Sequence, residues 1–538
     1  MTRILAGMVC VLACAPTAIA QAPPPSSPPL RQVVTEGVTV FTPTEIRWTL
    51  HLDENAPLPA TPDVLAAKLR ERYEHEGYTK ATVRCSFDET GRLTFQAEEG
   101  RIDAVAFEGV DQELGEELTG SFSIRPGDIY NERKVPVAVR KVLEPTGGAI
   151  RSGGYDLVDR GGRKTLVISV KRRNADFDAT FGTESREDWY SPVDGLNLAL
   201  GFGGAIFDQR RFAHTYLQGY VSYKFARDAV GYNLGLERPI VGGPDTPRLL
   251  ATAELHDATG SDDFWRLSIA EQSLVSLAFK NSFRDYYDQR GYQLGVSYQP
   301  NEANEFRVSW RADRHHALRN SSDYSFFRDD EAFRPNQQAV DGRLHSIVLG
   351  YTLDSRGLAD EDGRHRLARH TGADLFGTFG GPRSGFRLDW TSEIARTGFG
   401  GDFSFSRHIA NARAYVPLSA AQRIRARLIV GGSTGALPTQ RFFALGGIGS
   451  VHGYSFKESA GTGMVLGNIE YFLGSPRHAY VLGFFDVGRI ADPLPGNKEW
   501  LKGVGVGFGF SDLRIDFGWR ADDIPKSLQV LVRFGPTF

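Results

Sequence analysis

Apolar and polar residues alternate along most of residues 174–538, in segments of roughly ten residues separated by Gly, Asp, Asn and Pro. In the segment 504–510, for example, Val and Phe at even positions alternate with Gly at odd positions. A period of two places successive side chains on opposite faces of a strand. A long series of such segments is typical of a transmembrane antiparallel β-barrel, and the segments number between about 16 and 18.

The last segment has the clearest alternation. Its apolar residues occupy every second position up to the last residue of the sequence: Leu528, Val530, Val532, Phe534, Pro536 and Phe538. Proline has no N–H group, so we expect Pro536 at a position that needs no ladder hydrogen bond. A terminal aromatic residue in register resembles the assembly signal of outer-membrane proteins, and this resemblance assigns Phe534 and Phe538 to the signal.

Residues 34–100 show a mixed helical and extended pattern instead. Thr61-Pro62-Asp63 is a typical helix start, with Thr61 as N-cap and proline in the first turn. Apolar residues then recur every four positions, at Leu65, Leu69 and Tyr73, and Gly77 is expected to end the helix. Two alternating strands, 79–87 and 92–97, follow across a short hairpin turn. We therefore expect a helix packed on a small sheet.

Residues 101–173 are expected to form a second unit of the same class. A strand is predicted over 102–109, a turn over 122–128, a helix over 131–143 and a closing strand over 166–170. Pro136 falls inside the helical segment, where it should kink the helix or delay its start.

The N-terminus has the composition of a secretion signal. Arg3 precedes an apolar run, and Ala18-Ile19-Ala20 provides small residues for cleavage, so residues 1–20 are predicted to be a signal peptide. Residues 21–33 are a Pro/Ser-rich linker. Of the three cysteines only Cys85 follows the signal, which excludes an internal disulfide in the processed chain, and its strand position predicts a buried side chain.

Net charge is −3, which indicates no general attraction to nucleic acid. After the signal, no run of apolar residues is long enough for a membrane helix. A secreted chain with this pattern can still cross a membrane as a closed barrel, because closure pairs every backbone group.

Two motifs carry a resemblance to a known family. The segment 441–454, RFFALGGIGSVHGY, is followed by 480–489, YVLGFFDVGR. Together they resemble the signature of the BamA/FhaC superfamily, in which an LGG segment precedes V/L-R-G-Y/F and a later strand carries F-x-D-x-G. Residues 65–110 resemble a POTRA domain, with its Y-x-x-x-G-Y turn at 73–78 and its E-G-R-I segment at 99–102.

The resemblance implies an outer-membrane barrel of about 16 strands, preceded by two periplasmic POTRA-like domains. It also implies a loop, residues 436–460, that folds into the barrel lumen, where the family's arginine meets the aspartate of F-x-D-x-G. Here His452 occupies the arginine position and Asp486 is the aspartate. We call the expected contact set the loop lock: His452, Asp486, Gly446, Gly447, Gly453, Tyr454, Phe484 and Gly488. The alternative is that His452 is a solvated loop residue.

Strand alternation predicts further polar side chains inside the barrel, at Asn468, Glu470, Arg514 and Asp516. The sequence does not support other candidate sites. His315-His316 and Asp329-Asp330 lie in or beside a long connection, 318–341, and are expected at the surface rather than on a metal. Gly431 to Gly435 matches the G-x-S-x-G pattern around Ser433, but no helix follows it, so a barrel turn is predicted. The sequence indicates no enzyme, cofactor or metal site.

The function implied by the resemblance is polypeptide translocation or insertion at the bacterial outer membrane. The implied partners are an unfolded client polypeptide, outer-membrane lipid and the barrel assembly machinery that would insert this chain itself. Secretion of two-partner type and outer-membrane insertion both remain open. A passive pore or receptor without a protein client is the alternative function, and an outer-membrane hydrolase is a third.

Overall fold

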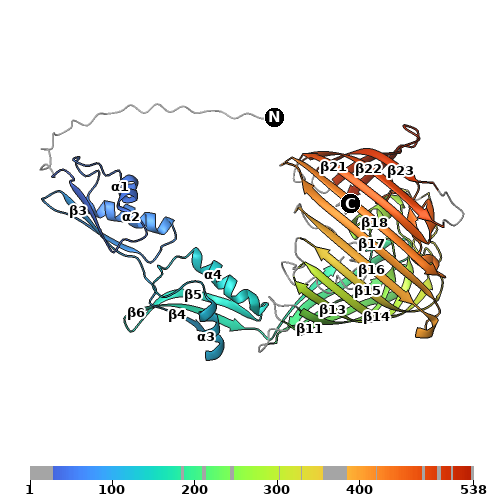
Figure 1. Ribbon diagram of the computed structural model, residues 1–538, viewed down its shortest axis with the longest axis horizontal. Coiled ribbons are helices and arrows are strands. Elements are labelled where there is room, and N and C mark those ends of the chain that lie inside the picture. The colour runs from blue at the N-terminus through green and yellow to red at the C-terminus, as the bar shows by residue number, and fades with distance from the viewer. Residues whose placement is uncertain are drawn as a thin grey trace, which may run out of the picture. The chain divides into compact units, whose positions relative to one another are not determined.

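The computed structural model describes residues 28–538 except 183–186, 209–213, 243–247, 302, 329, 356–383, 420, 475–478, 493–498, 511–512 and 535–538. The signal peptide, most of the linker, and Phe538 therefore lie outside the described residues. The chain divides into two compact units (Figure 1). The first contains the described residues up to 144 together with 151–171, and the second contains 145–150 and the rest.

The first sheet has the order β1-β3-β2, with β1 parallel and β2 antiparallel to the central strand. Its strands are β1 Gln32–Glu36, β2 Thr82–Phe87 and β3 Arg92–Glu98. Helix α2, Pro62–His75, begins after Thr61 and buries Leu65, Leu69 and Tyr73, as predicted. Leu30 is only 1% exposed, so the core begins inside the expected linker. Cys85 is partly buried against this core.

Two residues of the POTRA-like motifs meet in this unit. The Tyr73 hydroxyl donates to Glu99 Oε1 at 2.6 Å, and Glu99 also accepts the Val40 amide at 2.9 Å. Helix α1, Pro43–Leu50, was not predicted, although Thr42 and Glu45 form a capping box whose residue types are visible in the sequence.

The second sheet has the order β4-β6-β5, with strands β4 Ala104–Glu108, β5 Ile150–Arg160 and β6 Arg163–Arg172. Helix α4, Lys134–Leu143, starts three residues later than predicted and places Pro136 in its first turn, where the missing N–H costs nothing. Helix α3, Gln112–Ser121, was missed. Its cap is Asp111, whose carboxylate accepts the Leu114 amide at 3.0 Å.

The second unit is an antiparallel barrel (Figure 1). Its strand order closes the barrel by placing β25 beside β7. Among the described residues seventeen strands form it, and β7 and β8 pair with two parts of β9, so sixteen positions surround the lumen. The prediction of about sixteen strands is confirmed. The strands are β7 Ala175–Gly182, β8 Tyr190–Ser191, β9 Gly195–Ile206, β10 Thr215–Lys224, β11 Ala229–Val241, β12 Arg248–Gly260, β13 Tyr287–Asn301, β14 Asn304–Ala317, β15 Gly342–Asp354, β16 Gly385–Ala395, β17 Phe405–Pro417, β18 Gln422–Gly435, β21 Gly463–Gly474, β22 Ala479–Ala491, β23 Leu501–Phe510, β24 Leu513–Arg520 and β25 Gln529–Phe534.

Exposure alternates along these strands as the sequence pattern requires. In β22 the side chains of Leu482, Phe484 and Asp486 are buried, while those of Val481 and Phe485 are exposed. The outward face is therefore apolar and the inward face mixed, which is the arrangement of a barrel in lipid. No helix in the described part of the chain is long and apolar enough to span a membrane.

Three long connections emerge at one end of the barrel and pack against one another. They are residues 261–286, 318–341 and 436–462, which we call the first, second and third connections. The first contains an unpredicted helix, α5 Ile269–Phe279. The third contains two short paired strands, β19 Phe443–Leu445 and β20 Ser459–Gly461.

Candidate functional site: the third connection inside the barrel

The glycines of the third connection let its backbone lie directly on neighbouring chain. Gly453 has a φ of 84°, and a Cβ there would meet the Arg520 amide nitrogen at 2.3 Å. Gly449 has a φ of 69°, and a Cβ would meet the Arg266 carbonyl oxygen at 2.3 Å. These positions therefore exclude larger residues for both conformational and steric reasons.

The structure places the two central loop-lock residues in contact. His452 Nδ1 lies 2.6 Å from Asp486 Oδ2, and the His452 backbone amide donates to the same oxygen at 3.2 Å. Both side chains are buried. The Phe484 ring lies against the imidazole, with 4.3 Å between ring centroids. A carboxylate that accepts both a backbone and a ring N–H fixes the position of this part of the loop.

Asn468 and Arg427 extend this contact. Asn468 Nδ2 donates to Asp486 Oδ1 at 2.6 Å and to the Ser450 carbonyl at 2.7 Å. Arg427 Nη2 donates to Asn468 Oδ1 at 2.7 Å and to the Gly449 carbonyl at 2.7 Å. The guanidinium group that the loop lacks at position 452 is therefore supplied from strand β18. Sequence reasoning missed Arg427, although Arg423, Arg425 and Arg427 alternate in that strand.

Tyr454 anchors the far side of the same loop. Its hydroxyl accepts the Lys502 amide at 3.1 Å, and the Arg520 guanidinium stacks 4.4 Å from the centre of its ring. Arg520 also pairs with Glu458 at 2.9 Å. Gly446 and Gly447 both have positive φ, and the Gly446 amide donates to the Ser450 hydroxyl at 3.2 Å. Gly488 lies beneath Leu445, which a Cβ would meet at 2.7 Å.

The remaining predicted lumen residues form a separate charge cluster. Arg514 Nη1 lies 2.8 Å from Glu470 Oε1, and Arg514 Nε lies 2.7 Å from Asp516 Oδ1. All three side chains are buried. This cluster approaches the loop lock at Asp516 Oδ2, which lies 3.9 Å from His452 Nε2. Phe534 is 36% exposed and lies on the outward face of β25.

Apolar side chains of the third connection pack into a core inside the barrel. The core also includes inward side chains of β17, β18, β21, β22 and β23 and one residue of the first connection. Its members are Trp265, Ile409, Ile429, Phe443, Leu445, Val451, Tyr454, Met464, Leu466, Ile490 and Leu501. Within the described residues, this part of the lumen is therefore packed with protein.

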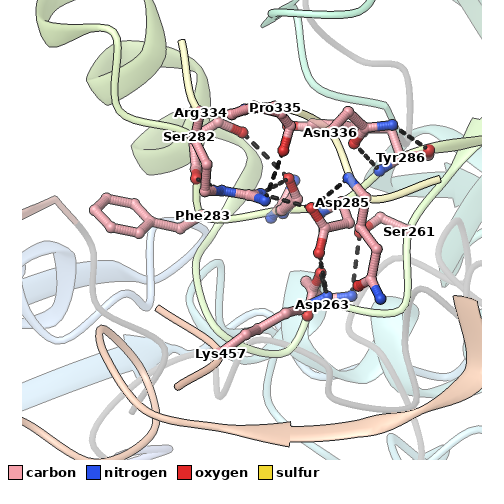
Figure 2. Close-up of polar contacts among 12 residues, drawn as sticks. Ser261, Asp263, Ser282, Phe283, Asp285, Tyr286, Arg334, Pro335, Asn336 and Lys457 are labelled. Carbon is pink, nitrogen blue, oxygen red and sulfur yellow. Dashed lines mark hydrogen bonds and ion pairs between the residues drawn. The ribbon is translucent and has the colours of Figure 1, made fainter. Parts of the chain in front are cut away.

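Charged side chains join the three connections to one another (Figure 2). Lys457 Nζ lies 2.7 Å from both Asp263 and Asp285. Asp285 also pairs with Arg334 of the second connection, at 2.6 Å. Asn336 accepts the Tyr286 amide and donates to the Tyr286 carbonyl, both at 2.8 Å. One aspartate thus holds cations from two different connections.

Arg266 holds the third connection through its backbone. Its guanidinium donates to the Ala444 carbonyl at 2.6 Å and to the Gly446 carbonyl at 3.1 Å. It is fully buried and lies 4.6 Å from the centre of the Trp265 ring and 5.2 Å from that of Phe456. A planar guanidinium can stack and donate in this way, whereas an ammonium group cannot do both.

A small cavity lies beside the start of the third connection. It has a volume of about 140 Å³, which corresponds to about five water molecules. Arg441 lines it and lies 2.6 Å from Asp262 and 3.5 Å from Glu393. Arg311 also pairs with Glu393, at 3.3 Å. Paired charges and apolar side chains such as Val348 and Ile409 share the wall, so the cavity has the mixed lining of a barrel interior.

Two predictions about other residues are wrong. His315 is fully buried in β14, 4.8 Å from the Tyr287 ring, because its position in the alternation points inward. Its neighbour His316 and Asp330 are exposed as predicted, and Asp329 lies outside the described residues. Gly431 to Gly435 continue strand β18 rather than forming a turn, and the Ser433 hydroxyl donates to the Thr462 carbonyl at 2.7 Å. The described residues include no group of three or more His, Cys, Asp or Glu side chains that could hold a metal.

Comparison with known proteins agrees with this architecture. Residues 268–524 match the Omp85 superfamily domain, and residues 165–346 match the C-terminal domain of a family of unknown function, DUF5686. No curated protein matches the sequence.

Among solved structures, BamA from Haemophilus ducreyi lacking POTRA domains 1–3 is similar, with 15% identity and a TM-score of 0.46 over 94% of this chain and 99% of that chain. CdiB from Escherichia coli has 15% identity and a TM-score of 0.33 over 96% and 91% of the two chains. CdiB from Acinetobacter baumannii has 11% identity and a TM-score of 0.36 over 95% and 90%.

Omp85 barrels reside in the outer membrane with POTRA domains in the periplasm, and they are transporters and insertases rather than enzymes. Proteins of this superfamily insert or secrete protein at the outer membrane. Over residues 268–524, just under half of the chain, the barrel is thus similar to the Omp85 superfamily domain.

Proposed function

We propose that this protein inserts unfolded polypeptide into the outer membrane at the seam of its barrel, the place in the strand order where β25 stands next to β7. The observation that carries this proposal is the contrast between lumen and seam. Apolar core residues and buried ion pairs of the third connection occupy the lumen, and the cavity beside them holds about five waters. An extended polypeptide cannot pass such a space unless the third connection leaves.

One of the two seam strands, β25, is short in its described part. Strand β25 contributes residues 529–534 and pairs with β24 over six positions, whereas β13 and β14 pair over thirteen. The Phe534 amide of β25 donates to the side chain of Glu271 at 3.3 Å. Strand separation costs less where few ladder bonds must break, so a client strand would enter most readily here.

Client capture is assigned to the sheet edges of the first unit. Strands β2 and β5 stand at the ends of their sheets, and most side chains of β5 are exposed. An extended peptide can add to such an edge through main-chain hydrogen bonds, which do not depend on client sequence. The client is thus an unfolded polypeptide, recognised by its backbone.

Secretion through the lumen is the second candidate. It is favoured by the two α+β sheets of the first unit, the number that resembles two-partner-secretion transporters. This route requires the third connection to leave the lumen, and that requirement separates the two candidates.

A reversible tether on the third connection tests the proposal. Cysteines replace Lys457 and Asp285, which lie in contact, and a cleavable bis-maleimide joins them in proteoliposomes. A urea-unfolded outer-membrane barrel protein serves as client, and its protease protection and heat-modifiability are measured. Insertion that proceeds with the tether intact supports the seam route. Insertion that stops and returns on cleavage contradicts it and favours the lumen. Single-cysteine variants treated with the same reagent are the control.

A further inference from the structure

Helix α5 has the reverse of the polarity expected for a helix at a water-exposed surface. It begins at the cap residue Ser268, whose hydroxyl accepts the Glu271 amide at 3.1 Å, and it ends at Lys280. Its polar side chains are buried: Glu271, Gln272, Ser273 and Ser276. Its exposed side chains are apolar, and Leu274 and Phe279 are 41% and 43% exposed. A helix in water buries its apolar stripe and exposes its polar one.

Glu271 and Gln272, on the buried polar face, have partners in the barrel and in the first connection. Glu271 Oε1 accepts from Arg533 Nε at 2.5 Å, and both side chains are fully buried. Gln272 donates to the Ser276 hydroxyl at 2.8 Å and accepts the Phe283 amide at 3.0 Å. The helix is therefore fixed to strand β25 by an ion pair, and its orientation is determined by these polar contacts.

The second connection extends the exposed apolar surface of α5. The Phe326 and Phe327 amides donate to the Leu277 and Ala278 carbonyls at 2.9 and 3.1 Å. Phe327 stacks on Phe279, with 5.6 Å between the ring centroids. Phe326 and Phe327 are 61% and 72% exposed, and Tyr324 is 56% exposed. Exposed aromatic residues in a cluster of this kind mark an interaction surface.

We propose that α5 and residues 324–327 lie against the acyl chains of the outer membrane, as part of the lipid-facing surface beside β25. Three observations identify lipid as the occupant. The exposed face is apolar while the polar face is buried, which is the polarity of a barrel wall in lipid. The adjoining strand β25 has the same outward character, with Val530 and Val532 exposed by 52% and 44%. The aromatic side chains suit the boundary between acyl chains and headgroups.

In this arrangement helix α5 forms part of the seam in addition to the seam strands. Where β25 contributes only six described residues, a helix with an apolar outer face would shield the inward Arg533 from acyl chains. The inference does not depend on the route of the client, because it concerns the contact of the resting protein with lipid.

Site-directed spin labelling of the full chain in liposomes tests the inference. In a background with every cysteine replaced by serine, single cysteines at Leu274, Phe279 or Phe327 carry a nitroxide. Their collisions with oxygen, which concentrates in acyl chains, are compared with collisions with a water-soluble nickel chelate. Val532 on β25 serves as the lipid reference, and Thr90, an exposed turn residue of the first unit, serves as the water reference.

We expect the accessibility at Leu274 and Phe279 to shift toward oxygen as far as at Val532. Accessibility to nickel as at Thr90 would overturn the inference, and so would low accessibility to both reagents, which would mean that protein, such as a second copy, covers the face. If the label itself perturbs folding, Leu274→Trp in brominated-lipid liposomes provides the second measurement. Loss of fluorescence of that tryptophan relative to unbrominated lipid is expected, and an unchanged signal contradicts lipid contact. No client is present, so the outcome is independent of the insertion assay.

Discussion

His452 and Asp486 form a short contact inside the barrel, with 2.6 Å between Nδ1 and Oδ2. Asp486 is the aspartate of the family signature, but His452 replaces its arginine. Histidine has one donor for this carboxylate, whereas arginine has a planar fork. Arg427 compensates from strand β18, because it donates to the Gly449 carbonyl and to Asn468, which in turn donates to Asp486. Arg427 of β18 and Asn468 of β21 thus both hold the loop, through the carbonyl groups of Gly449 and Ser450.

Replacing His452 by alanine should weaken this attachment. The loss of one hydrogen bond to a buried carboxylate is expected to cost about 1–3 kcal/mol. The temperature at which the barrel loses its heat-modifiable electrophoretic mobility should therefore fall. His452→Arg should leave that temperature unchanged or raise it, and a clear fall with arginine would contradict the pairing.

Arg427→Ala should destabilise the barrel more than His452→Ala. It leaves the Gly449 carbonyl and Asn468 Oδ1 without their donor in a buried site, at a cost of about 2–5 kcal/mol for the loss of a buried charged partner. Arg427→Lys should recover little, because an ammonium group cannot reach both acceptors in the geometry of a guanidinium. Urea denaturation followed by electrophoretic mobility measures both. Equal stability of Arg427→Lys and the unaltered protein would contradict the bridging role.

Lys457→Met should open the barrel to ions. The substitution keeps much of the side-chain length but removes the charge that joins Asp263 and Asp285. We expect larger and more frequent current steps in planar bilayers than with the unaltered protein, because the third connection loses its attachment to the first. Arg328→Met is the matched control, since the ion pair of Arg328 within the described residues is with Glu331, at the surface of the second connection. The same currents in both variants would contradict this prediction, because they would show that removal of any positive charge increases the current.

Acid should have an effect similar to that of Lys457→Met. Burial raises the pKa of Asp285, but the charges of Lys457 and Arg334 outweigh burial, and the pKa lies below its ordinary value of 3.8. A carboxyl group whose pKa is depressed on folding stabilises the contact above its unfolded pKa, and this stabilisation is lost as the pH falls through the folded pKa. Bilayer conductance should therefore be constant from neutral pH to about pH 4 and rise below it. Asp285→Asn should have raised conductance at neutral pH and a weaker response to acid.

The Tyr73–Glu99 contact should stabilise the first sheet. Burial raises the pKa of Glu99, but hydrogen bonds from Thr39, Tyr73 and the Val40 amide outweigh burial and lower it. Tyr73→Phe removes one donor and should cost about 1 kcal/mol. Hydrogen exchange of β3 amides in the full protein measures this loss, with the barrel amides as internal reference. Faster exchange in the barrel as well would mean that the effect is not confined to this contact.

Alternation in the sequence indicated the strands, because inward and outward side chains of a strand meet different surroundings at every second position. The number of about 16 strands in a membrane barrel rested on the family resemblance. Alternation also predicted that Asn468, Glu470 and Asp486 point inward. Helix α2 could be predicted from its cap and its four-residue spacing. Helices α1 and α3 also have capping residues, Thr42 and Asp111, from which their starts could have been predicted.

Tertiary structure alone decided which inward residues meet. Arg427 is 59 positions before Asp486, and only the pairing of β18 with β21, and of β21 with β22, brings both to Asn468. The reversed polarity of α5 likewise could not be explained from its own sequence, because Arg533, the partner of its buried Glu271, lies 262 residues away. Local sequence determines which face of a strand each residue occupies, but contacts inside a closed cylinder depend on strand register and on connections that cross the lumen, and neither is encoded in a local pattern.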